Sequence, residues 1–136
     1  MISAAAALGS GLLGGVYLAF SVAVLPALRR RPAQEAVATM REVNRVILNP
    51  VFGLLFFGTA VACLAVLVLA AVAGNPIGIA GALAGLAGFV VTGAVNVPGN
   101  VRLDRGAAWA DFDRRWTPAN HVRTGTSALA VALLLL

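Results

Sequence analysis

The chain has 136 residues, of which 60% are apolar and 11% are charged. A soluble domain carries roughly a quarter charged residues, so this composition cannot cover a surface that faces water on all sides. The net charge of +5 comes from ten basic residues, all arginine, against five acidic ones. Most of these arginines fall in two short loops beside apolar runs, which indicates membrane orientation and lipid headgroup contact and argues against nucleic-acid binding. The sequence therefore predicts one integral membrane domain, residues 1–136.

Four apolar segments divide the chain. A helix needs about 20 apolar residues to cross a hydrocarbon core of about 30 Å. The expected membrane spans cover residues 2–28, 51–73, 77–97 and 120–136. The predicted fold class is therefore all-α, a four-helix transmembrane bundle.

The charged residues predict how these spans are oriented. Nearly all of them lie in the loops after the first and third spans, and the turn between the second and third spans has none. In a four-span protein these two loops share one side of the membrane. The positive-inside rule makes that side cytoplasmic and places both termini outside. We expect the protein in the bacterial inner (plasma) membrane.

Two loop segments have helical patterns. In residues 33–48 the apolar positions fall on one side of a helix and Arg41, Glu42 and Arg45 on the other, which predicts an amphipathic interfacial helix. In residues 107–116, Trp109, Phe112 and Trp116 form a stripe at helical spacing. This pattern favours an aromatic anchor at headgroup level over a ligand-stacking site, although both tryptophans stay candidate substrate contacts.

The third span carries a stripe of small residues. Its members at helical spacing are Gly78, Gly81, Gly85, Gly88, Thr92 and Asn96. The first span has a similar small and polar face made of Ser10, Gly14, Tyr17 and Ser21. Small residues let helix backbones approach closely in membranes. We therefore expect the first and third spans to pack on each other.

Polar side chains from all four spans and the first loop helix converge on the cytoplasmic end. They are Tyr17, Ser21, Asn44, Asn49, Asn96, Asn100, Asn120, His121 and Arg123. Pro98 cannot donate a backbone hydrogen bond, so it should break the third helix and free carbonyls nearby. Polar groups at membrane depth are costly, and they are either a structural network or a functional site. One histidine and no nearby cysteine do not support a metal site.

Four strings of the sequence carry a family resemblance. They are GVYLAFSVAVLPAL (15–28), NRVILNPVF (44–52), VTGAVNVPGN (91–100) and the tryptophan stripe followed by NHVRT (109–124). Together they resemble the anthrone oxygenase-like (DUF1772) membrane proteins over nearly the whole chain. The chain departs from that pattern at Gly99, where a bulky residue is expected, and in a shorter loop before Trp109. The resemblance implies a four-helix membrane bundle and oxidation of polyketide anthrones to anthraquinones by molecular oxygen, with no established cofactor.

The first functional hypothesis is a membrane-embedded, cofactor-independent oxygenase of an electron-rich, anthrone-like aromatic. His121 would act as the base. Arg123, Asn96 and Asn100 would stabilise the developing oxyanion, and Tyr17 would orient the substrate phenol. The expected substrate-binding residues are Asn44, Asn49, Ser21, Trp109, Trp116 and Asn120. The expected partners are membrane lipid, an apolar aromatic molecule, molecular oxygen and a second copy of the chain.

Two further hypotheses belong to other classes. A non-catalytic membrane protein that binds an apolar small molecule or a partner subunit would use the same polar network structurally. It would need the asparagines for stability, and His121 would be dispensable. A transporter is less favoured, because the sequence has no inverted repeat and no charge at mid-membrane depth.

Overall fold

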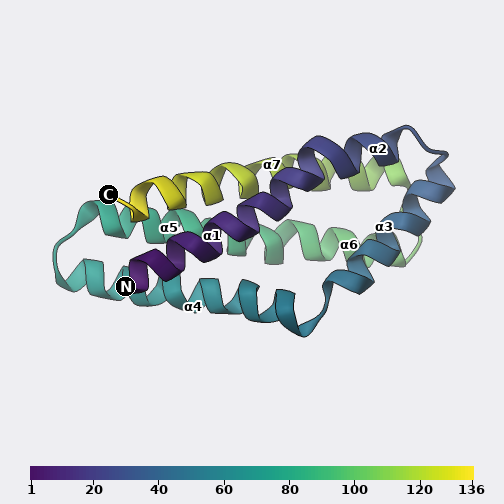
Figure 1. Ribbon diagram of the computed structural model, residues 1–136. Helices are drawn as coiled ribbons and strands as arrows, with labels where there is room; N and C mark the ends of the chain where they lie inside the picture. The colour runs from purple at the N-terminus through teal and green to yellow at the C-terminus, as the bar shows by residue number, and fades with distance from the viewer.

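The computed structural model describes residues 1–136, and the protein is entirely helical, as the sequence predicts. Five continuous helical segments follow one another (Figure 1). The first is α1 (Ile2–Ala19), η1 (Phe20–Val24) and α2 (Leu25–Arg29), and the second is α3 (Ala33–Ile47). The third is α4 (Pro50–Val72), the fourth is α5 (Pro76–Val91), η2 (Thr92–Asn96) and α6 (Val97–Asp104), and the fifth is α7 (Trp109–Leu134).

Three segments are long and apolar enough to cross a membrane. They are Ile2–Arg29, Pro50–Val72 and Pro76–Asp104, and they contain nearly all of the first three expected spans. The fourth expected span lies within α7, which begins earlier, at Trp109. The helix α7 is not apolar enough to count among these segments, since Asn120, His121 and Arg123 interrupt its apolar part.

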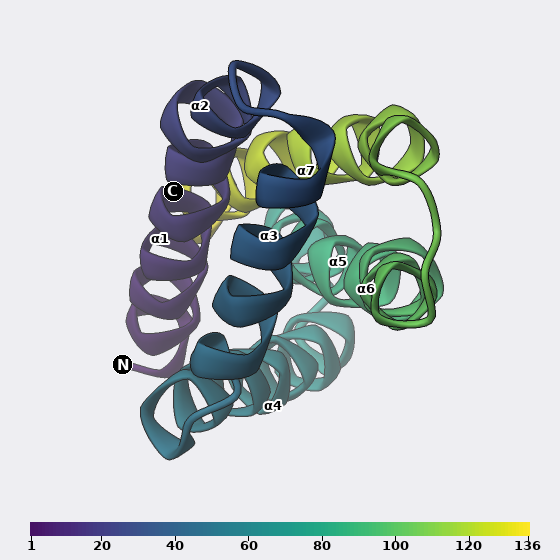
Figure 2. The ribbon, with the colours of Figure 1, turned by 90° about the vertical axis from the view of Figure 1, so that its right-hand side faces the viewer.

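The long helices lie side by side, and α7 occupies the position between α1 and α5 (Figures 1 and 2). The remaining long helix, α4, contacts α1 and α5 on the side opposite α7. The expectation that the first and third spans pack on each other is therefore wrong, because α1 and α5 are diagonal neighbours with little contact. Their small residues instead admit α7 and α4. In α1, Gly14 faces Ser127 and Gly9 faces Thr59, and in α5, Gly81 faces Leu134.

The third span does not end at Pro98. A five-residue π-helical segment, η2, precedes this proline, and η1 precedes Pro26 in the first span. A π segment widens the helix by one residue per turn, so a proline ring can follow without ending the helix. The helix consequently continues to Asp104, seven residues beyond its expected end.

The amphipathic helix expected at 33–48 is present as α3, and it crosses one end of the long helices (Figure 2). Its face with Ala36, Met40 and Asn44 is buried against protein. The short helix expected at 107–116 is the beginning of α7, where Phe112 and Trp116 are buried in the same cluster. The exposed aromatic anchor expected there is therefore wrong for these two rings, since α3 covers this end.

Every acidic residue pairs with a different arginine. The pairs are Arg29–Asp113, Arg31–Glu35, Arg41–Asp104, Arg45–Glu42 and Arg114–Asp111. The first pair joins α2 to α7 through two bonds of 2.8 Å from Arg29 to the Asp113 carboxylate. The hydrogen bonds from Arg29 hold the pKa of Asp113 below its ordinary value of 3.8.

The close approach of α1 and α4 gives a first prediction. A Cβ atom at Gly9 would overlap Thr59 Oγ1 and lie 3.0 Å from Thr59 Cβ, whereas one at Gly15 would meet nothing within 4 Å. Gly9→Ala should therefore lower the unfolding free energy in detergent by about 1–3 kcal/mol. The matched change Gly15→Ala, in the same helix, should raise it slightly, because alanine favours the helix. Equal effects at both positions would contradict this helix packing.

The ion pair of Asp113 gives a second prediction. A carboxylate whose pKa is lowered by folding stabilises the fold fully above its ordinary pKa of 3.8 and loses this contribution as the pH falls through the lower folded value. Asp113→Asn should cost about 1 kcal/mol or less at pH 7, and the difference from wild type should vanish in strong acid. Urea unfolding between pH 2 and 7 measures it, with the more exposed Asp111→Asn as control. A difference that grows in acid would be the opposite of this expectation.

Candidate functional site

A small cavity of about 90 Å³ lies where α1, the end of α3, the beginning of α4, η2 and α7 meet. Its walls are mostly apolar, and they include Val16, Phe20, Phe52 and Trp116. Its polar lining consists of Tyr17, Asn44, Thr92, Asn96, Asn100 and Arg123. Five of these six residues were expected at the site from the sequence, and Thr92 was not.

Arg123 is the central residue of the cavity, and its side chain is almost completely buried, with 6% exposed. Its guanidinium lies between two aromatic rings, 4.2 Å from the centre of the Tyr17 ring and 5.0 Å from that of Trp116. Nη1 donates to Thr92 Oγ1 at 3.2 Å, and Nη2 donates to Asn120 Oδ1 at 2.6 Å. The rings and the two hydrogen bonds offset part of the cost of burying the charge.

No carboxylate balances this buried charge. All five acidic residues pair with other arginines at the charged end of the molecule. A buried cation without a counter-ion is costly, because its hydration is lost and no opposite charge replaces it. The cavity beside Arg123 therefore favours an anionic or strongly electronegative occupant.

Three buried polar atoms on the cavity lining have no hydrogen-bond partner in the protein. They are Arg123 Nε, Asn96 Oδ1 and Asn44 Nδ2. Buried polar groups without partners are rare in folded proteins. Two donors and one acceptor on residues around one small space thus keep hydrogen-bonding capacity that the protein does not use, which a bound molecule or ordered water can satisfy after a small side-chain shift.

Asn120 holds Arg123 in place and ties α7 to α1. It is fully buried, at 0% exposed, and its Nδ2 donates to Tyr17 O and to Ser21 Oγ, each at 2.8 Å. Its Oδ1 is then free to accept from Arg123. Asn120 and Ser21 thus position Arg123 through hydrogen bonds, and neither of them lines the cavity.

Trp116 and Asn100 form the wall toward α6. Trp116 Nε1 donates to Asn100 Oδ1 at 2.8 Å, and Asn96 Nδ2 donates to Trp116 O at 3.3 Å. The Trp116 ring also packs at 5.5 Å from Phe20 and 5.6 Å from Phe112. These contacts fix the indole whose face meets Arg123.

A wider hollow of about 870 Å³ opens between α3 and α6, beside the cavity. The two spaces share Asn44, Ile47, Leu48, Val97 and Asn100. Charged residues of α3 and α6 line its outer part, among them Arg41 and Asp104. Its size lies in the range of about 300–1,000 Å³ that is typical of ligand sites. We refer to this hollow as the vestibule.

Besides Asn120 and Ser21, three more residues expected at the site lie outside the cavity. His121 follows Asn120 on α7, but its side chain is exposed and forms no side-chain hydrogen bond. Asn49 caps α4, where its Oδ1 accepts from Phe52 N at 3.0 Å. Trp109 is half-buried and contacts the Phe112 ring at 5.5 Å without reaching the cavity. The geometry therefore does not bring His121 near Arg123.

Thr92 could have been identified from the sequence. It lies four residues before Asn96 in the small-residue stripe of the third span, so both must share one helix face. By itself, a stripe of small residues indicates only a packing surface. The apolar lining from Phe20, Ile47, Leu48 and Phe52 has no comparable signal, because apolar residues fill the neighbouring positions too.

The chemistry of the cavity follows from its groups. A guanidinium and two amides can hold an oxyanion, and the aromatic and aliphatic walls can hold an apolar ring and molecular oxygen. No group of three or more histidine, cysteine, aspartate or glutamate side chains is placed to hold a metal ion.

Comparison with known proteins agrees with the resemblance seen in the sequence. A family model described as anthrone oxygenase matches residues 47–133, more than half of the chain. The match includes Asn96, Asn100, Trp116 and Arg123, and it excludes Tyr17. A search of curated proteins and a search of solved structures each found no match.

The site gives a third prediction, on two neighbouring residues of α7. Asn120→Leu should lower the unfolding free energy by about 1–3 kcal/mol, because it removes the buried amide that bonds the Ser21 hydroxyl, the Tyr17 carbonyl and Arg123 Nη2. His121→Leu, one residue away on the exposed face, should change it by less than about 0.5 kcal/mol. Thermal unfolding in detergent compares the two, and a larger loss at His121 would refute the assigned orientation of α7.

Proposed function

Because the chain belongs to the anthrone oxygenase family, we propose that it is a membrane-embedded oxygenase. Its substrate is an electron-rich aromatic carbon acid of the anthrone type, which molecular oxygen converts to a quinone. The observation that carries the proposal is the buried Arg123 guanidinium, which has no carboxylate partner and lies at a cavity whose lining residues Asn44 and Asn96 each have an unpaired amide atom. Such a site fits the anion of a carbon acid.

The proposal places the site in a four-helix transmembrane bundle with α7 as the fourth span. Two of the three polar residues that interrupt the apolar part of α7, Asn120 and Arg123, are compatible with a span, because they are buried inside the bundle and do not face lipid. The loops that carry the charges lie at the end near α2, α3 and α6, and the turn between α4 and α5 has no charge. The positive-inside rule then makes the α3 end cytoplasmic.

The reaction balances without a further reductant. Loss of a proton from the ring CH₂ group leaves a carbanion whose charge is delocalised through the ring onto the ketone oxygen. This anion passes an electron to oxygen, and the two radicals combine to form a C–O bond and, after protonation, a hydroperoxide. Loss of the second hydrogen with cleavage of the O–O bond yields the carbonyl and water. The carbon loses four electrons, and the two oxygen atoms gain them.

Arg123 lowers the cost of the first step. Opposite charge within hydrogen-bond distance favours the charged form of an acid, so the guanidinium makes the bound carbon acid a stronger acid. Arg123 Nε is the donor left free for the oxyanion, and Asn44 Nδ2 is a second one on the cavity lining. The unpaired Asn96 Oδ1 accepts a hydrogen bond from a substrate phenol.

The vestibule supplies the room that the cavity lacks. A cavity of about 90 Å³ is too small for a three-ring aromatic, which belongs in a space within the usual range of ligand pockets. The rings therefore lie in the vestibule between α3 and α6 and point their oxyanion edge past Asn44 and Asn100 toward Arg123. Ile47, Leu48 and Val97, shared by both spaces, provide the apolar contact.

The acceptor of the proton is water of the vestibule. Neither an imidazole nor a carboxylate lines the cavity itself, and the two carboxylates of the vestibule, Glu42 and Asp104, are paired with Arg45 and Arg41. His121, the base suggested by the sequence, is exposed on α7 and outside the cavity lining. In this mechanism the substrate's own acidity, increased by Arg123, replaces a general base.

A non-catalytic binding protein is the second candidate, because the unpaired cavity atoms would be satisfied equally by a bound anionic aromatic that does not react. The two candidates differ in turnover alone. Tight binding of an anthrone with a rate of quinone formation no faster than the spontaneous oxidation would favour the binding protein.

The fourth prediction separates Arg123 from His121. Purified protein in detergent is given an anthrone, and quinone absorbance and oxygen uptake are followed together. Arg123→Met should lower kcat/KM by about 100-fold or more, since it removes the group that stabilises the oxyanion. Arg123→Lys should recover part of the loss, because it restores the charge without the planar fork. His121→Ala should keep wild-type turnover.

The folded state of each variant is checked by its melting temperature. Full turnover in a folded Arg123→Met protein would reject the proposed site. Loss of turnover in a folded His121→Ala protein would return the base to His121 and require a substrate that reaches the outer face of α7.

A further inference from the structure

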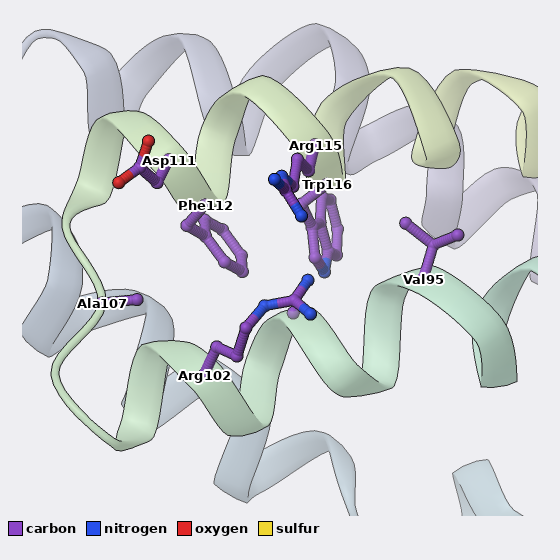
Figure 3. Close-up of a pocket in the computed structure, with 8 residues that line it drawn as sticks. Val95, Arg102, Ala107, Asp111, Phe112, Arg115 and Trp116 are labelled. Carbon is purple, nitrogen blue, oxygen red and sulfur yellow. The ribbon is translucent and has the colours of Figure 1, made fainter.

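A second hollow lies between α6 and the beginning of α7, and Trp116 is the one residue that it shares with the cavity. It has a volume of about 280 Å³. Figure 3 shows that Arg102 from α6 and Arg115 from α7 both point into the space between the two helices, beside the rings of Phe112 and Trp116. Val95 extends the apolar part of the lining along η2.

The two arginines have no ionic partner. All five acidic residues are paired with other arginines, and the one acid on the lining, Asp111, receives a hydrogen bond of 2.9 Å from Arg114. Arg102 and Arg115 therefore bring two positive charges to one hollow without a carboxylate of their own. Like charges that face each other repel, and an anion between them removes the repulsion.

The floor of the hollow is open because residue 99 is glycine. A Cβ atom at Gly99 would lie 3.3 Å from Trp116 Cδ1 and 3.9 Å from Phe112 Cε2. A larger side chain would fill the space over these rings. The absence of a side chain thus leaves an apolar surface in the same hollow as the two arginines.

The charged and apolar parts of the hollow lie at different levels. Arg102 lies two residues before the end of the apolar segment Pro76–Asp104, and Val95 lies seven residues nearer its middle. Seven residues of helix correspond to about 10 Å. An anion at the arginines and a hydrocarbon chain beside Val95 match the arrangement of a phospholipid at a membrane surface.

We propose that this hollow binds an acidic phospholipid. The lipid phosphate lies between Arg102 and Arg115, and an acyl chain runs over Trp116 and Val95 toward the membrane interior. A free phosphate shares the headgroup chemistry, but it makes no use of the apolar half of the lining. The site is independent of the proposed oxygenase activity.

The test uses the whole protein in a neutral detergent. Native mass spectrometry measures retention of added phosphatidylglycerol, with phosphatidylcholine and inorganic phosphate as the two comparison ligands. Wild type should retain phosphatidylglycerol and neither of the others. Arg102→Gln with Arg115→Gln should weaken its binding about 30-fold, which corresponds to the usual contribution of two arginines near an anionic lipid surface.

Two further variants serve as controls. Arg30→Gln with Arg105→Gln removes the same charge from residues that form no ion pair and do not line the hollow, and it should leave the affinity unchanged. Gly99→Leu keeps every charge but fills the floor, and it should weaken lipid binding. Melting temperatures without lipid confirm that each variant folds.

Three results would overturn the proposal. Equal losses in the two arginine pairs would mean a nonspecific charge effect, and equal retention of phosphatidylcholine would mean that the arginines do not select the headgroup. Binding of inorganic phosphate as tight as that of the lipid would assign the hollow to a free anion.

Discussion

The buried guanidinium of Arg123 is the interaction on which the polar end of the protein depends. A positive charge inside a helical bundle of this hydropathy is stable only if neighbouring groups replace its hydration. Tyr17 and Trp116 cover its two sides, and Thr92 and Asn120 accept from its two terminal nitrogens. Four separate partners on α1, η2 and α7 must therefore be correctly placed for one side chain. The compensation is incomplete, because Nε has no partner and no carboxylate is near.

Two local backbone features make this arrangement possible. The π segments η1 and η2 provide Phe20, Thr92 and Asn96 to the cavity lining, and each precedes a proline that the helix passes without ending. An extra residue in a helical turn changes which side chains face inward, and such bulges are frequent at functional sites. In α7, by contrast, the regular helical geometry determines which of two adjacent side chains points into the bundle. Asn120 and His121 differ by about 100° around the axis, so one is buried and the other exposed.

This difference shows what the sequence could and could not predict. The helical class, three of the four expected spans and the convergence of Tyr17, Asn96, Asn100 and Arg123 follow from composition, spacing and motifs, and the family follows from the resemblance of four strings. The exclusion of His121 does not, since its direction depends on which helices flank α7. The burial of Trp116 was missed for a similar reason: an aromatic stripe looks the same whether lipid or α3 covers it. The sequence also does not show that every acidic residue pairs with an arginine other than Arg123; this is visible only in the folded structure.

The incomplete compensation of Arg123 has a direct consequence for the proposed chemistry. If a site binds the anion of an acid tenfold more tightly than the neutral acid, it lowers the apparent pKa of that acid by one unit, because the two quantities form one thermodynamic cycle. A site that fully satisfied the guanidinium would have no such preference left. A site in which every guanidinium nitrogen donated to the anion would stabilise the bound anion as much as the transition state of its reaction with oxygen. A guanidinium with two terminal nitrogens already engaged and Nε unpaired lies between these limits, and it can promote ionisation without trapping the anion that must react with oxygen.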